Sequence, residues 1–335
     1  MFNSIFILTN LIEKDPGFIV GPISKILGII INLVFKFVYT ITTDHSLGLT
    51  IILFTIIVRL LLIPLNYKQQ KSMYIMQKIQ PEMKKIQDKY KGNKDPEVAK
   101  KMQMEMSKLY SKHNYNPIGG CLPLFIQLPI FVALYFIMKN SYQFVTDIGN
   151  LYTDIANQIL ATPNYADVLV PIVTPLVPKG MTIDISQLHD MLRAINKFSP
   201  ADWEAVQAGL PSLDISNLLA QKSSIEYFLG INLAETVGFS FPKVLLAILS
   251  GVTTFLSSWV ISRKNKSDDP TLKMQQKIMN IVMPLMMTFF TISIPCGVAI
   301  YWIVGNIVQI VQQIFLSKYC EKKFAENDLV SVSNK

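Results

Sequence analysis

Long hydrophobic runs separated by polar segments dominate the pattern of this chain. Five of them approach or exceed the roughly 20 residues that a helix needs to cross a bilayer. They are too long and continuous for barrel strands, and a helix closes its backbone hydrogen bonds within the crossing segment. The pattern therefore predicts an all-α membrane protein with a five-helix transmembrane bundle. The predicted spans are residues 46–65, 117–138, 243–261, 278–295 and 296–316.

Composition supports a membrane protein and excludes an ordinary soluble domain. Half of the 335 residues are hydrophobic and 16% are charged. The mean hydropathy is +0.35. The sequence shows no internal repeat of the kind that marks many transporters.

The N-terminal segment, residues 1–45, contains a further apolar stretch at 18–41. This stretch is long enough to span, but Lys25, Asn32 and Lys36 follow one another at spacings of seven and four, on one helical face. Such a face is typical of an amphipathic helix that lies in the membrane interface. We predict an interfacial helix at 18–41; a sixth span is the alternative.

Loop charges predict which side of the membrane each segment faces. Residues 66–116 hold 12 basic and 5 acidic residues, 262–277 hold 5 and 2, and 317–335 hold 4 and 3. Residues 140–242 instead hold 4 basic and 10 acidic residues. Because Lys and Arg near span ends favour the cytoplasmic side, we expect the first three segments in the cytoplasm of a bacterium. The enlarged segment 139–242 should then lie outside its plasma membrane.

Residues 66–116 show a helical period that is interrupted once. Apolar side chains recur three or four residues apart over 76–90 and again over 98–109. Between them, residues 92–93 (Gly-Asn) and 95–96 (Asp-Pro) mark a turn. We therefore predict an antiparallel helical hairpin in the cytoplasm.

Methionines are concentrated in this predicted hairpin. Their flexible thioethers suit a surface that must accept varied apolar partners. The alternative is that they fill the seam between the two helices. The candidates for contact with a partner are Met76, Met83, Met102 and Met106.

Arg59 is the single charged residue inside the first predicted span. At bilayer depth its guanidinium stays protonated, at an estimated cost of about 3 to more than 10 kcal/mol. It could snorkel past Leu65 to the headgroups. Polar side chains in the other spans favour a second interpretation, in which Arg59 faces a hydrated cavity open to the cytoplasm. The residues predicted to line this groove are Arg59, Gln127, Thr254, Ser258, Asn306, Gln309, Gln312 and Gln313.

Four separated motifs resemble one known family. They are IVRLLLIPLNYKQQKSM (57–73), NPIGGCLPLFIQLPIFVALY (116–135), DPTLKMQQKIM (269–279) and PCGVAIYWIVGNIVQIVQQ (295–313). In this order they resemble the YidC/Oxa/Alb membrane protein insertases, in their shorter Gram-positive form.

The resemblance implies a function, partners and a role for Arg59. It implies five helices around a hydrophilic groove open to the cytoplasm and the lipid, with Arg59 at the position of a positively charged residue. It also implies an interfacial helix at 18–41. The expected activity is to insert client membrane proteins and to help them fold. The expected partners are nascent membrane proteins, the ribosome, the SecYEG translocon and membrane lipids, with no specific nucleic-acid sequence.

Chemistry of other kinds finds little support in the sequence. His45, His113 and His189 are scattered, with no Ser-His-Asp or metal-ligand spacing. We therefore expect neither an enzyme nor a bound metal or cofactor. The remaining alternative is a small-solute channel or transporter that uses Arg59 as its intramembrane site.

Residues 139–242 extend far beyond the short connection expected from the family. Residues 186–198 and 199–210 are predicted to form short amphipathic helices. Ser199 is suited to cap the second, Pro200 to its first turn and Asp202 to its dipole. We expect this segment to form a folded cap.

Overall fold

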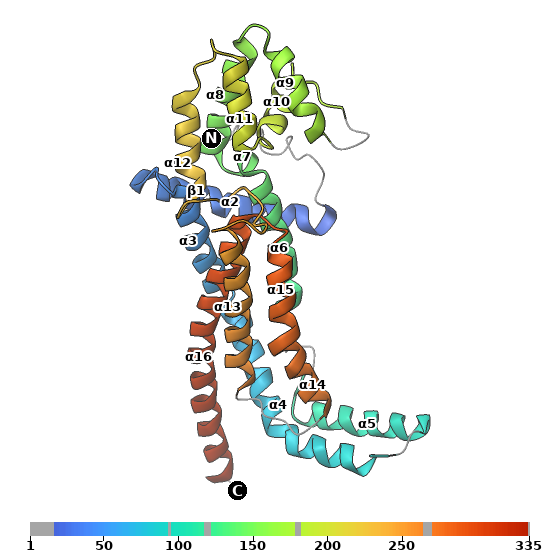
Figure 1. The fold of residues 1–335 in the computed structure, drawn as a ribbon. Helices are drawn as coiled ribbons and strands as arrows, with labels where there is room; N and C mark the ends of the chain where they lie inside the picture. Colours follow the sequence, from blue (N-terminus) through green and yellow to red (C-terminus); the bar gives the residue numbers. More distant parts are fainter. Residues whose placement is uncertain (1–16, 93–94, 117–121, 178–181, 264–269, 334–335) are drawn as a thin grey trace. The chain divides into compact units, whose positions relative to one another are not determined.

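The computed structural model describes residues 17–92, 95–116, 122–177, 182–263 and 270–333. Within them the regular secondary structure is helical, apart from one pair of short strands and one isolated β-bridge (Figure 1). The helices are α2 (Gly17–Ile41), α3 (Ser46–Leu61), α4 (Ile63–Lys89), α5 (Pro96–Lys112), α6 (Leu122–Lys139), α7 (Ser141–Phe144), α8 (Thr146–Ala161), α9 (Tyr165–Val173), η2 (Thr174–Leu176), α10 (Leu188–Ile195), α11 (Pro200–Gly209), α12 (Ser216–Glu226), α13 (Val244–Ser262), α14 (Pro270–Lys277), η3 (Ile278–Val282), α15 (Met283–Thr291) and α16 (Cys296–Ser333).

Three helices among the described residues are long and apolar enough to cross a membrane, and a bent pair could supply a fourth span. The three are Val20–Ile41, Val244–Ser262 and Cys296–Lys323, and the bent pair is α3 with α4. The remaining two predicted spans correspond to shorter apolar helices, at Ile126–Lys139 and Ile278–Thr291. The all-α membrane class is thus clear, with three to four candidate spans.

The first predicted span, 46–65, does not form one straight helix. Helix α3 ends at Leu61, α4 begins at Ile63, and the two axes differ by 54°. Pro64 lies in the first turn of α4. Because proline lacks an N–H and its ring clashes with the preceding turn, it favours a helix start over a helix interior. Residues 63–65 therefore belong to α4.

The chain divides into two compact units. Unit 1 comprises residues 1–54, 129–236 and 295–298. Unit 2 comprises residues 55–128, 237–294 and 299–335.

In unit 1, helix α2 packs one of its faces against the start of the 139–242 segment. Gly28 lies under the Phe144 ring, where an added Cβ would come within 2.6 Å of the ring carbons. The Asn32 side chain accepts a hydrogen bond of 2.9 Å from the backbone N–H of Thr146. The opposite stripe of α2 exposes large apolar side chains. They are Ile26, Ile29, Leu33, Phe37 and Ile41.

In unit 1, the described part of residues 139–236 is folded around its own apolar core. Ile148, Ile155 and Ile159 of α8 are fully buried. The predicted helices 186–198 and 199–210 form as α10, which is 8 residues long and clearly shorter than predicted, and α11, which is 10 residues long. Ser199 and Asp202 complete a reciprocal capping box at the start of α11, as their spacing suggested.

A buried polar cluster joins α8 to α12 in the same unit. Glu226 accepts hydrogen bonds from Tyr152 Oη at 2.9 Å and from Lys222 Nζ at 2.7 Å. Burial, together with the neighbouring Glu226 carboxylate, raises the pKa of Tyr152 well above its usual value. The phenol therefore remains a hydrogen-bond donor at neutral pH.

After α12 a short β-hairpin leads to the beginning of α16. Strands β1 (Tyr227–Phe228) and β2 (Ile231–Asn232) pair antiparallel. The carbonyls of Leu233 and Glu235 then accept hydrogen bonds from the N–H groups of Gly297 and Cys296. These contacts satisfy donors at the helix start that have no partner within the helix.

In unit 2, α13 packs closely against α15 (Figure 1). Gly251 makes this approach possible, because an added Cβ would overlap Thr288. Near the other end of α13, the Asn280 amide donates to Ser262 Oγ at 2.8 Å.

Helices α4 and α5, also in unit 2, lie side by side (Figure 1). Their contact is built on Ile79, Met83 and Leu109, with partly buried residues around them. At the far end, Lys89 Nζ donates to Glu105 at 2.6 Å. Hydrogen bonds from Lys89 and Tyr90 lower the pKa of Glu105, so this carboxylate is ionised at neutral pH.

Candidate functional site

Arg59 is buried in unit 2, with 8% of its surface exposed. Its Nη1 donates a hydrogen bond of 3.2 Å to Gln309 Oε1 on α16. Its Nε is buried and has no hydrogen-bond partner among the described residues. None of the ion pairs found among those residues includes Arg59. The guanidinium thus has spare donors and no carboxylate partner in the described part of the chain.

One face of α16 provides the surface on which Arg59 rests. Tyr301, Gly305 and Gln309 follow one another at spacings of four, which places them on one helical face. A Cβ added at Gly305 would lie 2.8 Å from Arg59 Nη2. Position 305 therefore has room for Arg59 only because it carries no side chain. On the same face, Gln127 of α6 donates a hydrogen bond of 2.8 Å to Tyr301 Oη.

Further along α16, glutamine side chains connect it to α3 and α4. The Gln312 amide donates to the backbone carbonyl of Arg59 at 2.9 Å and accepts from Asn66 at 3.1 Å. The Gln313 amide donates to Gln70 at 2.5 Å. Because α3 ends shortly after Arg59, its last carbonyls lack hydrogen-bond donors within the helix. Gln312 supplies a donor to one of these carbonyls, that of Arg59.

A second polar contact joins α16 to α13. The Asn306 amide lies 3.0 Å from Thr254 Oγ1 and 3.1 Å from Thr253 Oγ1. The indole N–H of Trp302 donates to Thr254 at 2.9 Å. Ser258, also predicted for the groove, donates instead to the Phe255 carbonyl of its own helix. Hence Thr254 and Asn306 meet directly, whereas Ser258 bonds within α13.

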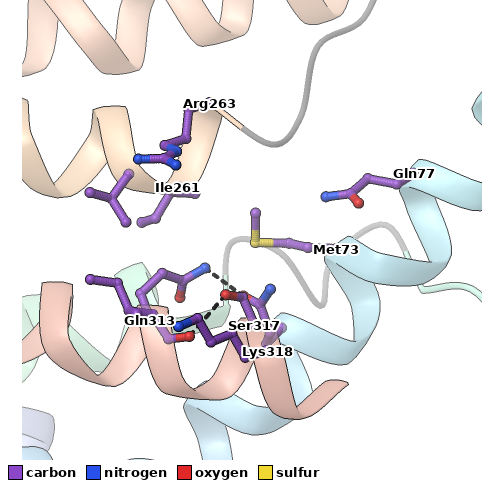
Figure 2. A pocket seen from close by; sticks show the side chains of 10 residues that line it. Met73, Gln77, Ile261, Arg263, Gln313, Ser317 and Lys318 are labelled. Atoms are coloured by element: carbon purple, nitrogen blue, oxygen red, sulfur yellow. Dashed lines mark hydrogen bonds between the residues drawn. The ribbon is translucent and has the colours of Figure 1, made fainter. Parts of the chain in front are cut away.

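A cavity of about 270 Å³ lies among α4, α13 and α16 in unit 2 (Figure 2). Gln70, Met73 and Gln77 line it from α4, and Gln313 lines it from α16. Arg59 is not among its lining residues. Of the predicted groove residues, only Gln313 borders this cavity. The others make the hydrogen bonds described in the preceding paragraphs.

Comparison with known proteins assigns the chain to a family. The family described as 60Kd inner membrane protein matches residues 37–323. The chain belongs to this family. The resemblance seen in the four sequence motifs is therefore confirmed, including the similarity to proteins from Gram-positive bacteria.

Relatives of the 60Kd inner membrane protein family cover most of the chain. The membrane protein insertase YidC of Oceanobacillus iheyensis is 30% identical, over 82% of this chain and 76% of its own length. That of Clostridium acetobutylicum is 31% identical, over 89% and 85%. That of Wolinella succinogenes is 30% identical over 94% of this chain, which spans 40% of the longer relative.

In this member of the 60Kd inner membrane protein family, the methionines of α4 and α5 differ in exposure. Met83 is buried in the contact between the two helices, and Met106 packs against it. Met76 and Met102 are half-buried, and Met104, which was not among the candidates, is exposed. A period of three to four residues identifies the seam but does not say which methionines lie at its edge.

Sequence reasoning missed several residues of the site. Asn66 and Gln70 lie 7 and 11 residues after Arg59, at helical spacing. That spacing could have linked them to Arg59. The bend between α3 and α4, and the assignment of residue 66 to the cytoplasmic segment 66–116 instead of the first span, concealed the relation. Gly305 carried no visible signal, because only the contact with Arg59 explains it.

Proposed function

We propose that this chain is a membrane protein insertase in which Arg59 attracts acidic or polar segments of client proteins. The observation that carries the proposal is a buried guanidinium with an unbonded Nε and no carboxylate partner among the described residues. A buried charge without a partner is costly, so an acidic client segment would relieve that cost when it arrives.

The amide groups around Arg59 fit a role in accepting transient partners. Gln309, Gln312 and Asn66 can each donate and accept hydrogen bonds, and they carry no net charge. The polar backbone of a client could therefore replace one of their hydrogen bonds, and no ion pair would have to break. We propose that apolar client helices leave sideways into lipid while their polar tails pass along this surface.

We propose a topology that follows from the loop charges. The α4–α5 pair and the C-terminus would lie in the cytoplasm, and residues 139–242 outside. Helix α2 would lie in the outer interface, because one of its faces packs on Phe144 and Thr146 while the other exposes apolar side chains. Helix α2 is also long and apolar enough to cross, so a sixth span is the alternative.

The α4–α5 pair would act as the first receptor for nascent chains. It is basic, and Met76, Met102 and Met104 retain exposed surface that could contact apolar client segments. Its lysines would favour approach to ribosomal RNA or to anionic headgroups. Contact with the SecYEG translocon is a further part of the proposal, which rests on family membership alone.

Reconstitution into liposomes tests the function. Full-length protein in vesicles should increase the protease-protected fraction of a single-span client with a short acidic tail, relative to vesicles without protein. The same vesicles should show no increased leakage of small solutes. Solute flux without client insertion would contradict the proposal and would favour the channel alternative.

A further inference from the structure

The cavity between α4, α13 and α16 has a lining that suits an amphiphilic anion. Arg263 and Lys318 contribute two positive charges, and Gln70 and Gln77 contribute side-chain amides. Met73, Val260 and Ile314 supply apolar surface. None of the described lining residues is acidic. Figure 2 shows Met73 projecting into the space between the residues of α13 and those of α16.

The polar groups of the lining are arranged so that donors remain available. Gln70 uses its side-chain oxygen to accept from Gln313, which leaves its amide nitrogen free of that bond. The Arg263 guanidinium lies 5.2 Å from the centre of the Trp259 ring. This stacking holds the cation beside the end of α13 and leaves the edge of its planar group able to bind an oxyanion.

The lengths of two candidate spans place both cations near the end of the hydrocarbon core. Arg263 immediately follows the candidate span Val244–Ser262. Lys318 lies five residues before the end of the candidate span Cys296–Lys323 and 22 residues after Cys296. At about 1.5 Å per residue this is roughly 33 Å, close to the thickness of the hydrocarbon core. In a bilayer of that thickness the cavity would open at the level of the lipid phosphate groups.

We propose that this cavity binds the phosphate of an anionic phospholipid, with Arg263 and Lys318 on the phosphate and the apolar lining against the glycerol and upper acyl region. The volume of about 270 Å³ is near the lower end of small-ligand pockets, which suits a headgroup better than a folded peptide segment. This inference does not depend on the insertase proposal, because its readout is bound lipid.

The test measures lipid binding by purified full-length protein in detergent micelles that contain phosphatidylcholine. The probe is fluorescent phosphatidylglycerol, and fluorescent phosphatidylcholine is the neutral comparison. Wild-type protein should prefer phosphatidylglycerol. The double variant Arg263→Gln/Lys318→Gln should bind it about tenfold more weakly or worse, because two cations near the headgroup are lost. Equal affinity of wild-type protein for both lipids would overturn the proposal.

Matched variants separate the cavity from general surface charge. The double variant Lys277→Gln/Lys322→Gln removes the same charge from exposed positions outside the cavity and should change binding less than about twofold. Met73→Trp keeps every charge but fills the cavity, and should also weaken binding. If the control pair weakens binding as much as the cavity pair, or Met73→Trp has no effect, the site is not this cavity. If that cavity double variant does not fold, Lys318→Gln alone, a change at an exposed position, replaces it and should also weaken binding of phosphatidylglycerol.

Competition distinguishes the source of the phosphate. Displacement of phosphatidylglycerol by millimolar inorganic phosphate would show that the site recognises the phosphate group and also accepts the free ion. Absence of displacement, with the lipid preference retained, would assign the site to the intact lipid. Displacement by an unphosphorylated acidic peptide at lower concentration than inorganic phosphate would contradict a phosphate site and favour a peptide ligand.

Discussion

At the scale of single residues, the position of Arg59 depends on what its neighbours lack. Gly305 has no side chain where the guanidinium lies, and no carboxylate among the described residues neutralises the charge. The neighbouring amides hold Arg59 in place but leave its Nε without a hydrogen-bond acceptor. Gln309 accepts one hydrogen bond from the guanidinium, and Gln312 binds the backbone carbonyl. A charge held in this way remains able to attract an external anion.

Gly305→Val should displace the guanidinium, because its Cβ alone would lie 2.8 Å from Nη2. We expect overpacking to lower the free energy of unfolding by about 1–3 kcal/mol. Insertion of clients with acidic tails should fall further than this loss of stability explains. Thermal unfolding and a client insertion assay measure the two effects. Ile307→Ala, on the exposed side of the same helix, is the control and should leave insertion unchanged. Normal insertion by Gly305→Val would show that the placement of Arg59 is unimportant.

At the scale of helices, the sequence predicted which segments form helices better than it predicted where each helix begins and ends. The span predicted at 243–261 matches α13 within one residue at each end, because its apolar run is bounded by lysine and arginine. The span predicted at 296–316 marks only the apolar part of α16, which continues to Ser333 because lysine and glutamate also favour helices. The strands β1 and β2 have two residues each, too few for a period to be visible.

For the groove residues, the sequence identified candidate side chains but not the helices that they contact. Amides on α16 were recognisable as candidates because they are unusual in an apolar run. Their partners were not, since a sequence does not say which helix faces which. Thr254 therefore proved to meet Asn306, whereas Ser258 bonds within its own helix.

The α4–α5 pair offers a prediction about its seam and its outer surface. Met83→Ala should destabilise the pair by about 2–5 kcal/mol, because the side chain is buried against Leu109. Met104→Ala should change stability by less than about 0.5 kcal/mol, because Met104 is exposed. Amide hydrogen exchange across α4 and α5 reports both. Similar exchange in the two variants would mean that the seam is not where the structure places it.

At the scale of the whole molecule, two units with different characters share one chain. Unit 1 contains residues 139–236 of the enlarged segment, with an apolar core of their own and the capped helix α11. Unit 2 contains every predicted groove residue, together with α4 and α5. This division is consistent with an insertion surface that is encoded within unit 2, with the 139–242 segment as an addition to it.

The central claim is that the charge of Arg59 draws acidic client segments into the membrane. The most direct measurement compares wild-type protein, Arg59→Ala and Arg59→Lys with two clients that differ only in tails rich in Asp and Glu or in Asn and Gln. At an effective dielectric constant of about 20, a charge pair at 4 Å gains about 4 kcal/mol. Arg59→Ala should therefore reduce insertion of the acidic-tailed client on the order of tenfold or more, and that of the neutral-tailed client far less. Arg59→Lys should retain most activity, because it keeps the charge. Equal loss for both clients in Arg59→Ala would contradict the account.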